Sequence, residues 1–571
     1  MLLSLEAFSK YADLVGSGSL EAVAVDFETT GLRVRDGDRA FIMGFAFDDV
    51  RHSVRTDSDD IIPLMQLFFS NTRTKYLAHN AKFEMSFLKH QFNTEIKGDI
   101  WDTEVMERIA HNGMTSYSLE NCAIRHKQYK YVPMMRWLEK TKKLHHEAPE
   151  DLIVPYVEQD AWLSLYLYRK QRDTFTVWDK SPVPVSKLVN LESRTTKNLF
   201  KMEDTGLFLD TSYCYRALDH EVKRENLAKE KFKQLSGAEF INSRQCLSPI
   251  FRKYGLPVLR TELKNESFSD DTLELSKDHE LIKIIRTIRN AQKRHGTYWS
   301  NLVDLAINEM IHPNIRQAGT VTGRFSCKDP NVQNWPDDTE TGSEYPIRRA
   351  FIAPSGCQIL SLDYKQKEYR FLIDQAQDLK AINDVYTGSD PHQKAADLVG
   401  VTRSKAKNAV FAKMYGASTQ KLSEMLGISF HQASVLSGAI DRNAPDAAKY
   451  CRKLIESAED DGWGYNIKGR RYFFPPSKPY CYPDYRIQGS CSEILRTAID
   501  SITELIAASA KGRTALLIPI HDELVFQLDD CDKHLIPEFK KLMINAYKPW
   551  QLPMDVSATI GGNFHDLEDL H

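Results

Sequence analysis

The chain has 571 residues, of which 42% are hydrophobic and 27% are charged, and its formal net charge is −3 at pH 7. This length predicts about three to five domains of ordinary soluble composition. No run approaches the roughly 18 apolar residues of a membrane-spanning helix, which excludes an integral membrane protein. The nine cysteines show no CxxC pair and no zinc-like spacing, which indicates reduced thiols in a cytoplasmic protein.

The first 175 residues alternate short strands with helices, a pattern that predicts an α/β domain. The N-terminal segment carries Glu6, Lys10 and Asp13 within its apolar pattern, so we expect an amphipathic helix and not a secretory signal. The strands are expected at 23–32, 41–49 and 75–80, and the last helix at 154–173.

Several acidic residues of this domain are spaced so that their side chains can converge. Asp26 and Glu28 are two apart on a strand and share a face, and Tyr156 and Asp160 are four apart on a helix. Glu84 follows in HNAKFE. An isolated DxE is more often surface charge, but four converging carboxylates predict a site for two Mg²⁺ ions, which neutralise them.

The segment WDKSPVPVSK (178–187) is the clearest domain boundary, because its prolines make a short, stiff connector. Residues from 188 to about 305 read as mostly helical and contain basic runs. Strands return from about 306 and are interrupted by a helical block at about 390–460.

Two further acidic residues sit at the ends of strand-like runs in the second half. Asp363 closes CQILSLD, and Asp522 lies at a tight turn in LLIPIHDELVF, so together they predict a second site for two metal ions. Between them, a predicted helix carries residues of one face at intervals of four: Arg403, Lys407, Phe411 and Tyr415. Its basic end suits phosphates, although the spacing alone favours an ordinary amphipathic helix with an aromatic stripe in the core.

Taken together, these segments resemble motifs A, B and C of the family A DNA polymerases: SLDYKQKEYR, RSKAKNAVFAKMYGAS and IPIHDELVF. The order VDFETTGL, HNAKFE and YVEQD resembles the three motifs of a 3′→5′ exonuclease of the DEDD superfamily, tyrosine subtype. The resemblance implies that Asp26, Glu28, Glu84 and Asp160 bind metal and that Tyr156 orients the attacking water. It implies further that Asp363 and Asp522 bind the polymerase metals and that Lys407 donates a proton to pyrophosphate.

The resemblance also implies contacts with substrates. Nucleotide contacts are expected from Arg403, Lys407, Phe411, Tyr415, Gln366, Glu368 and His392. DNA contacts are expected from Arg324, Gln333, Asn334, Gln488 and His521. Glu368 would fill the space of a ribose 2′-hydroxyl. Lys365 and Lys367 depart from the family pattern, and a cation beside Glu368 could pair with it and either loosen or stiffen the selection against ribose. Asp102 resembles a polar support residue near the nuclease site, and a helix N-cap is an equal alternative.

The implied fold is α/β and multidomain: a ribonuclease-H-like exonuclease domain followed by a right-hand polymerase. The expected bounds are 1–178 for the exonuclease, 188–305 for the thumb, 306–385 and 480–571 for the palm, and 386–479 for the fingers. Because the sequence starts at the exonuclease, the 5′-nuclease domain of bacterial polymerase I is expected to be missing. We expect two Mg²⁺ per active site, with Mn²⁺ able to substitute.

The expected function is template-directed DNA synthesis with proofreading, in phage replication and in the cytoplasm of a bacterial host. The expected partners are primer-template DNA and dNTPs, with a phage helicase, primase or single-strand binding protein as further candidates, and the expected state is a monomer. The alternatives are a 3′→5′ exonuclease whose C-terminal half only binds DNA, and a non-catalytic replication scaffold.

Overall fold

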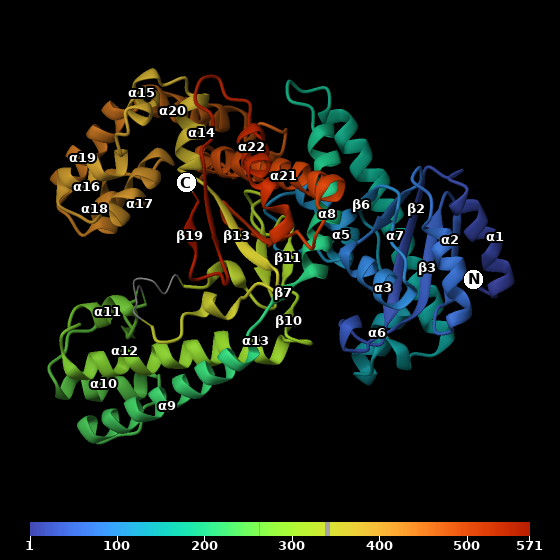
Figure 1. The fold of residues 1–571 in the computed structure, drawn as a ribbon, viewed down its shortest axis with the longest axis horizontal. Coiled ribbons are helices and arrows are strands. Elements are labelled where there is room, and N and C mark those ends of the chain that lie inside the picture. The colour runs from blue at the N-terminus through green and yellow to red at the C-terminus, as the bar shows by residue number, and fades with distance from the viewer. Residues whose placement is uncertain (262, 337–342, 571) are drawn as a thin grey trace.

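The computed structural model describes residues 1–261, 263–336 and 343–570. The N-terminal part is built on a six-stranded sheet in which β2 pairs antiparallel with β3 and parallel with β5 (Figure 1). The strands, in sheet order, are β1 (Leu2–Leu3), β4 (Val50–Arg55), β3 (Ala40–Phe47), β2 (Ala22–Thr29), β5 (Lys75–Ala78) and β6 (Ile100–Asp102).

Helices cover both faces of this sheet. On one face, Val23, Val25 and Phe27 of β2 belong to a core shared with α1 (Leu5–Gly16), α2 (Ile62–Phe68) and α3 (Lys82–Phe92). On the other face, Ala24 packs in a core shared with α4 (Thr103–Ala110) and the long α7 (Glu150–Trp178). Since side chains alternate along a strand, Asp26 and Glu28 share Ala24's face and point toward α7.

Small residues let α7 approach the sheet closely. A Cβ added at Gly44 of β3 would lie 2.4 Å from the carbonyl oxygen of Val157 on α7, so no larger residue fits there without a backbone shift. Two shorter helices, α5 (Leu119–Arg125) and α6 (Val132–Thr141), also contact α7. The predicted amphipathic N-terminal helix, strands and last helix of this part are therefore confirmed.

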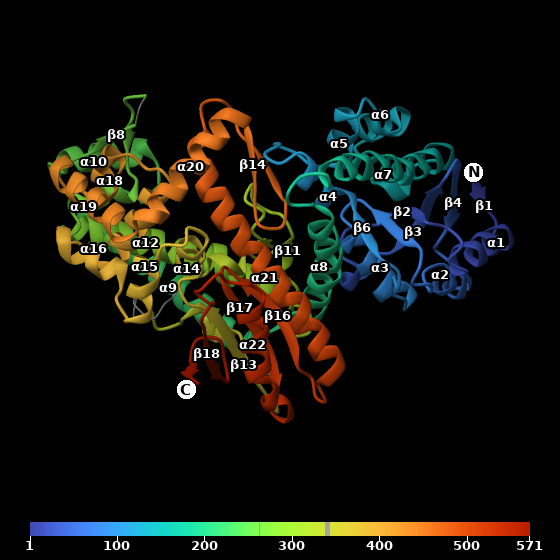
Figure 2. The ribbon, with the colours of Figure 1, turned by 90° about the horizontal axis from the view of Figure 1, so that it is seen from above.

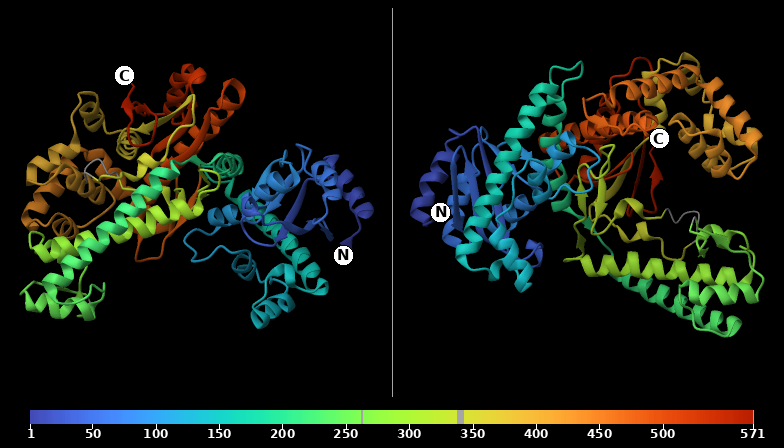
Figure 3. Two further views of the ribbon diagram at one scale, coloured as in Figure 1. Left: turned by 60° about the horizontal axis from the view of Figure 1, so that its bottom comes forward. Right: turned by 180° about the vertical axis from the view of Figure 1, so that it is seen from behind.

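After the connector, α8 (Ser186–Thr205) packs against α3 and β6 on one side and against α21 (Tyr482–Ser509) and β16 (Ala515–Ile520) on the other (Figure 2). Next, α9 (Thr211–Ser236) and α12 (Glu280–Lys293) lie side by side and extend away from the second sheet (Figure 1, Figure 3). Between and after them lie α10 (Arg244–Lys253), α11 (Asp270–Glu274), a π-helical turn (Arg294–Trp299) and α13 (Ser300–Leu305).

The second sheet has five strands, and its central strand β13 is antiparallel to both neighbours, β17 and β18. In sheet order the strands are β16 (Ala515–Ile520), β17 (Glu523–Asp529), β13 (Cys357–Tyr364), β18 (Val556–Gly561) and β19 (Glu568–Asp569). β13 runs directly into α14 (Lys367–Gln375), and α22 (Ile536–Asn545) contacts α21. Short ribbons complete the fold: β7 (Leu207–Phe208) with β10 (Met310–Ile311), β8 (Leu259–Arg260) with β9 (Glu266–Ser267), β11 (Asn314–Arg316) with β12 (Ser326–Lys328), and β14 (Trp463–Tyr465) with β15 (Arg471–Phe473).

A helical region follows α14 and confirms the helical block predicted at about 390–460 (Figure 1). It contains α15 (Leu379–Tyr386), α16 (Pro391–Val399), α17 (Arg403–Met414), α18 (Thr419–Leu426), α19 (Phe430–Asn443) and α20 (Pro445–Asp461). Among the helices that the structure describes, none is both long enough and apolar enough to cross a membrane. The predicted mixed α/β, multidomain class is confirmed.

Candidate active sites

The first candidate site is an acidic cluster between β2, α3 and α7. Carboxylate oxygens of Asp26, Glu28 and Asp160 all lie within 4.8 Å of one another. Glu84 approaches from α3, is only 2% exposed, and is close enough for the charge on Asp26 to raise its pKa. The sheet and two helices thus bring together all four acids that the sequence singles out.

Burial and mutual repulsion make this cluster costly when it is fully charged. Burial and the charge of Asp160 raise the pKa of Asp26 to about 8, and burial with neighbouring carboxylates raises the pKa values of Glu28 and Glu84. Glu84 Oε2 and Asp160 Oδ1 are buried and make no hydrogen bond with any described residue. An all-oxygen donor set with unpartnered buried oxygens fits hard divalent cations.

Lys130, in the loop between α5 and α6, is part of this site, although no pattern in the sequence selects it. Its Nζ lies 2.5 Å from Asp160 Oδ2 and donates a hydrogen bond of 2.8 Å to Tyr156 Oη. The carboxylate of Asp160 raises the pKa of Lys130 despite its burial. Lys130 therefore partly compensates the acids and holds the hydroxyl of Tyr156. Its loop has no periodic pattern, so only the tertiary contact identifies it.

Asp102 has both of the roles considered for it. Its Oδ1 accepts a hydrogen bond of 3.0 Å from the amide of Glu104 and so caps α4. The same carboxylate accepts bonds from the amides of Asn80 and Ala81, at 3.0 and 2.9 Å, just before α3. Asp102 thereby fixes the start of the helix that carries Glu84.

The second candidate site lies on the second sheet. Asp363 is near the end of β13 and faces Glu523 in the register with β17, and Asp522 occupies the turn just before β17. Reduced hydration and the charge of Asp522 raise the pKa of Asp363 to about 6, while Lys367 and Lys407 oppose this shift. The two acids are therefore close neighbours beside a cationic group from α17, as the sequence predicts.

Glu368 and Lys367 are adjacent on α14, yet they point to different partners. Glu368 accepts hydrogen bonds from Arg324 and, at 2.8 Å, from Tyr415 Oη. Lys367 is only 2% exposed, and its Nζ lies 2.8 Å from Asp522 Oδ1. Lys365 is paired with Asp555, at 3.6 Å. The ion pairs of these lysines are thus with Asp522 and Asp555 and not with Glu368: Lys367 and Glu368 are successive helical residues, which point about 100° apart, and Lys365 precedes the helix.

Three of the four selected residues, Arg403, Lys407 and Phe411, lie on α17, and Tyr415 directly follows its last turn. Arg403 Nε lies 2.6 Å from Asp390 Oδ2, and Lys407 is exposed. The ring of Phe411 lies 5.9 Å from that of Tyr415 and 5.4 Å from that of His392. His392 is buried among these rings, and burial lowers its pKa to about 4.

The remaining selected residues lie in varied environments. Gln333 donates a hydrogen bond of 2.9 Å to the carbonyl of Pro519, and Asn334 is exposed. Gln488 donates to Asp484 on α21. His521 and Gln366 have left-handed backbone conformations, with φ of 55° and 52°, at the turn before Asp522 and at the start of α14.

The model of DNA polymerase family A matches residues 215–566, which is more than half of the chain. The chain belongs to DNA polymerase family A. A 3′-5′ exonuclease model matches residues 5–174, the part that contains the acidic cluster. The two-part architecture predicted from the sequence is therefore confirmed.

Curated relatives of this family A chain are bacterial enzymes named DNA polymerase I. That of Helicobacter pylori is 27% identical and aligns with 93% of this chain and 60% of its own length. That of Chloroflexus aurantiacus is 26% identical, with 98% and 63% covered. The thermostable enzyme of Thermus aquaticus is 30% identical, with 64% and 46% covered. The chain thus spans about three fifths of the length of the relatives it matches most extensively.

Among solved structures, the polymerase domain of Pol1 from M. smegmatis, in complex with a DNA primer-template and dNTP, matches with a TM-score of 0.83. The match covers 98% of both chains at 21% sequence identity. This likeness shows that the two chains share their fold.

Proposed function

We propose that this protein is a template-directed DNA polymerase that extends a primer from dNTPs and edits it with a separate 3′→5′ exonuclease site. The observation that carries the proposal is the presence of two acidic sites on separate sheets, each within the part of the chain that matches the corresponding family model. The domain bounds 1–178, 188–305, 306–385 with 480–571, and 386–479 belong to this proposal as exonuclease, thumb, palm and fingers.

In the polymerase site, Asp363 and Asp522 would hold two Mg²⁺ ions, or Mn²⁺ in their place. Bound there, such ions lower the pKa of an attacking hydroxyl and stabilise the leaving phosphate oxygens. Arg403 and Lys407 would bind the triphosphate, with Lys407 as the proton donor to the leaving group. Phe411 would pack on the nucleotide, and Glu368, held by Tyr415, would exclude a ribose 2′-hydroxyl.

In the exonuclease site, Asp26, Glu28, Glu84 and Asp160 would hold the cations. Tyr156, whose hydroxyl is fixed by Lys130, would orient the attacking water. The DNA itself would contact Arg324, Gln333, Asn334, Gln488 and His521. Gln366 and His392 complete the proposed nucleotide-binding set. We also propose that the protein acts in phage replication, with a phage helicase or primase as partner. The identity of the genes next to its own gene would test this.

The test is extension of a 5′-labelled primer on a template with Mg²⁺, with and without dNTPs. We expect Asp522→Ala to lose extension but keep primer shortening, and Asp26→Ala to lose shortening but keep extension. The two variants are matched controls for each other, since each leaves the other site intact. A wild-type protein that shortens the primer but never extends it would favour the alternative, a nuclease whose C-terminal half only binds DNA.

A further inference from the structure

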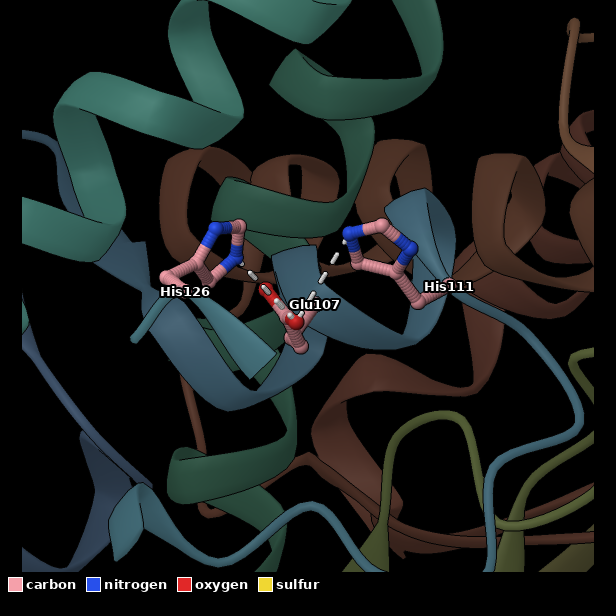
Figure 4. A group of neighbouring side chains, drawn as sticks. All are labelled: Glu107, His111 and His126. Carbon is pink, nitrogen blue, oxygen red and sulfur yellow. Dashed lines mark ion pairs between the residues drawn. The ribbon is translucent and has the colours of Figure 1, made fainter. Parts of the chain in front are cut away.

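A second cluster of metal-ligand side chains lies in the exonuclease domain, away from the four acids. Glu107 lies on α4, His111 directly follows that helix, and His126 directly follows α5 (Figure 4). One ligand atom from each of the three lies within 4.8 Å of the other two. No step proposed above uses these residues.

The separations between these atoms suit a shared ion better than direct hydrogen bonds. His111 Nε2 and His126 Nε2 lie 3.9 and 3.7 Å from Glu107 Oε1. Hydrogen bonds to oxygen are shorter, at about 2.7–3.2 Å. Two bonds of about 2.1 Å to one zinc ion separate their ligand atoms by about 3.4 Å at a tetrahedral angle and by at most about 4.2 Å.

The carboxylate of Glu107 is held in the orientation that such a site needs. Its side chain is fully buried, and Oε2 accepts a hydrogen bond of 2.9 Å from Gln171 Nε2. Gln171 is itself fixed, because its Oε1 accepts a 2.9 Å bond from the indole of Trp101. This arrangement turns Oε1 toward the two imidazoles, and support of this kind is usual behind metal ligands.

The site is also reachable from solvent and carries one competing cation. The side chain of His111 is 38% exposed, which lets water complete the coordination from that side, whereas His126 Nε2 is buried and makes no hydrogen bond with any described residue. Arg125 Nε donates a 3.1 Å hydrogen bond to Glu107 Oε1. A carboxylate oxygen has two lone pairs, so this bond leaves one for an ion.

We propose that Glu107, His111 and His126 form a binding site for a zinc ion that joins the end of α4 to the end of α5. Two imidazoles and one carboxylate are a donor set that zinc accepts, whereas Mg²⁺ and Ca²⁺ favour oxygen alone. Because Asp102 caps the start of α4 and fixes the start of α3, an ion held at the end of α4 stabilises the exonuclease domain.

The test is titration of the metal-free full-length protein with Zn²⁺ by calorimetry in excess Mg²⁺, which occupies the carboxylate sites. We expect one Zn²⁺ per chain that Mg²⁺ does not displace. His111→Ala and His126→Ala are expected to weaken binding by about tenfold or more, as loss of even a supporting residue does. His431→Ala, which removes an exposed histidine on α19, is the matched control and should bind as the wild type does.

Thermal melting shows whether the variants are correctly folded. Without zinc, the two histidine variants should melt as the wild type does, because both side chains are partly exposed. Added Zn²⁺ should raise the Tm of the wild type and of His431→Ala but not that of the other two. The proposal is overturned if the wild type binds no Zn²⁺ in excess Mg²⁺, or if His111→Ala and His126→Ala bind it as tightly as the wild type. Neither readout depends on polymerase or nuclease activity.

Discussion

At the scale of single residues, each of the two proposed sites contains a lysine in contact with one of its acids. Lys130 contacts both Tyr156 and Asp160 in the exonuclease site, and Lys367 contacts Asp522 in the polymerase site. Each places a positive charge against a carboxylate that is expected to bind metal. Each lysine therefore partly neutralises its site before any cation arrives, and it also affects how strongly the site attracts one.

Replacing Lys367 with Met should strengthen metal binding in the polymerase site. The ammonium and the metal compete for Asp522, so we expect half-saturation at a metal concentration about threefold to tenfold lower. The free energy of this change is a modest part of the ~4 kcal/mol between unit charges 4 Å apart at an effective dielectric constant of about 20. Mn²⁺ binding followed by EPR measures this directly. Lys365→Met, which removes a half-exposed lysine paired with Asp555, is the control. Equal Mn²⁺ affinity of Lys367→Met and wild type would contradict the idea.

Replacing Lys130 with Met should slow primer shortening and leave extension unchanged. Tyr156 then loses the donor that fixes its hydroxyl, and loss of such support typically lowers activity about 10- to 100-fold. Single-turnover degradation of a single-stranded primer measures the effect. Lys127→Met, which alters an exposed lysine of the same loop, should degrade the primer at the wild-type rate. Unchanged degradation by Lys130→Met would show that Tyr156 is positioned without it.

The contacts of these two lysines could not be predicted from the sequence, whereas the local placement of the acidic residues could. The strand of Asp26 and Glu28, the helix of Tyr156 and Asp160, and the turn of Asp522 follow from local spacing, which fixes the face on which a side chain lies. The partner of Lys367 depends instead on how β13 and β17 pair, and that of Lys130 on where an irregular loop packs. Such contacts join distant segments and leave no periodic trace.

At the scale of elements, helix ends and helix faces set the geometry of both sites. Asp102 joins the start of α4 to the residues before α3, and thereby connects two helices of the exonuclease domain. On α21, Asp484 and Gln488 lie one turn apart and are bonded to each other. Burial and the carboxylate of Glu368 raise the pKa of Asp484 to about 6, although Arg324 opposes the shift.

The variant Asp102→Ala should destabilise the exonuclease domain by about 2–3 kcal/mol, the sum of a lost cap and amides left without an acceptor. Primer shortening should fall with it, since Glu84 loses its fixed position. Asp102→Ser separates the two roles, because a serine can cap α4 but is too short to reach Asn80 and Ala81 as well. We expect Ser to recover part of the melting temperature but little of the nuclease rate. Full recovery of both by Ser would mean that capping alone matters.

Asp484→Asn should stabilise the protein at pH 8 more than at pH 4.5. The folded pKa of about 6 exceeds the value of about 3.9 in an unfolded chain. The folded state therefore binds more protons between these values, and wild-type stability falls as the pH rises through them. Melting temperatures at the two pH values measure the difference. Glu504→Gln, an exposed change on the same helix, should have the same small effect at both. A gain for Asp484→Asn that does not grow with pH would contradict the assignment.

At the scale of the whole molecule, a buried cluster of four charges joins α8, which follows the connector, to the distant helix α21. Glu192 of α8 contacts Arg470 and, at 3.2 Å, Arg496 of α21, and Arg470 Nε lies 2.7 Å from Glu493. All four side chains are at most 2% exposed. Arg496 also donates a 2.6 Å hydrogen bond to the carbonyl of Gly323, beside Arg324. Burial favours neutral Glu192, but the two arginines outweigh it and lower its pKa.

Arg496→Met should destabilise the protein by about 3–5 kcal/mol, because it leaves two buried carboxylates with one arginine, and so one uncompensated buried charge. Urea denaturation followed by tryptophan fluorescence measures the loss. Arg194→Met is a matched control, because it breaks an ion pair of 2.7 Å between the same two helices in which Arg194 is 50% exposed. That change should cost about 1 kcal/mol or less. Equal decreases in the free energy of unfolding in both variants would show that the buried cluster stabilises the protein no more than an exposed ion pair does.

The pairing of the second sheet also has a consequence for the order in which the two sites appear during synthesis. Asp363 lies on the central strand, and its register partner Glu523 is made 160 residues later, followed by β18 on the other side. All four acids of the exonuclease site, by contrast, lie within the first 160 residues. Domains generally fold as units from the N-terminus during translation. A ribosome-bound chain thus completes the site proposed to degrade DNA well before the site proposed to synthesise it.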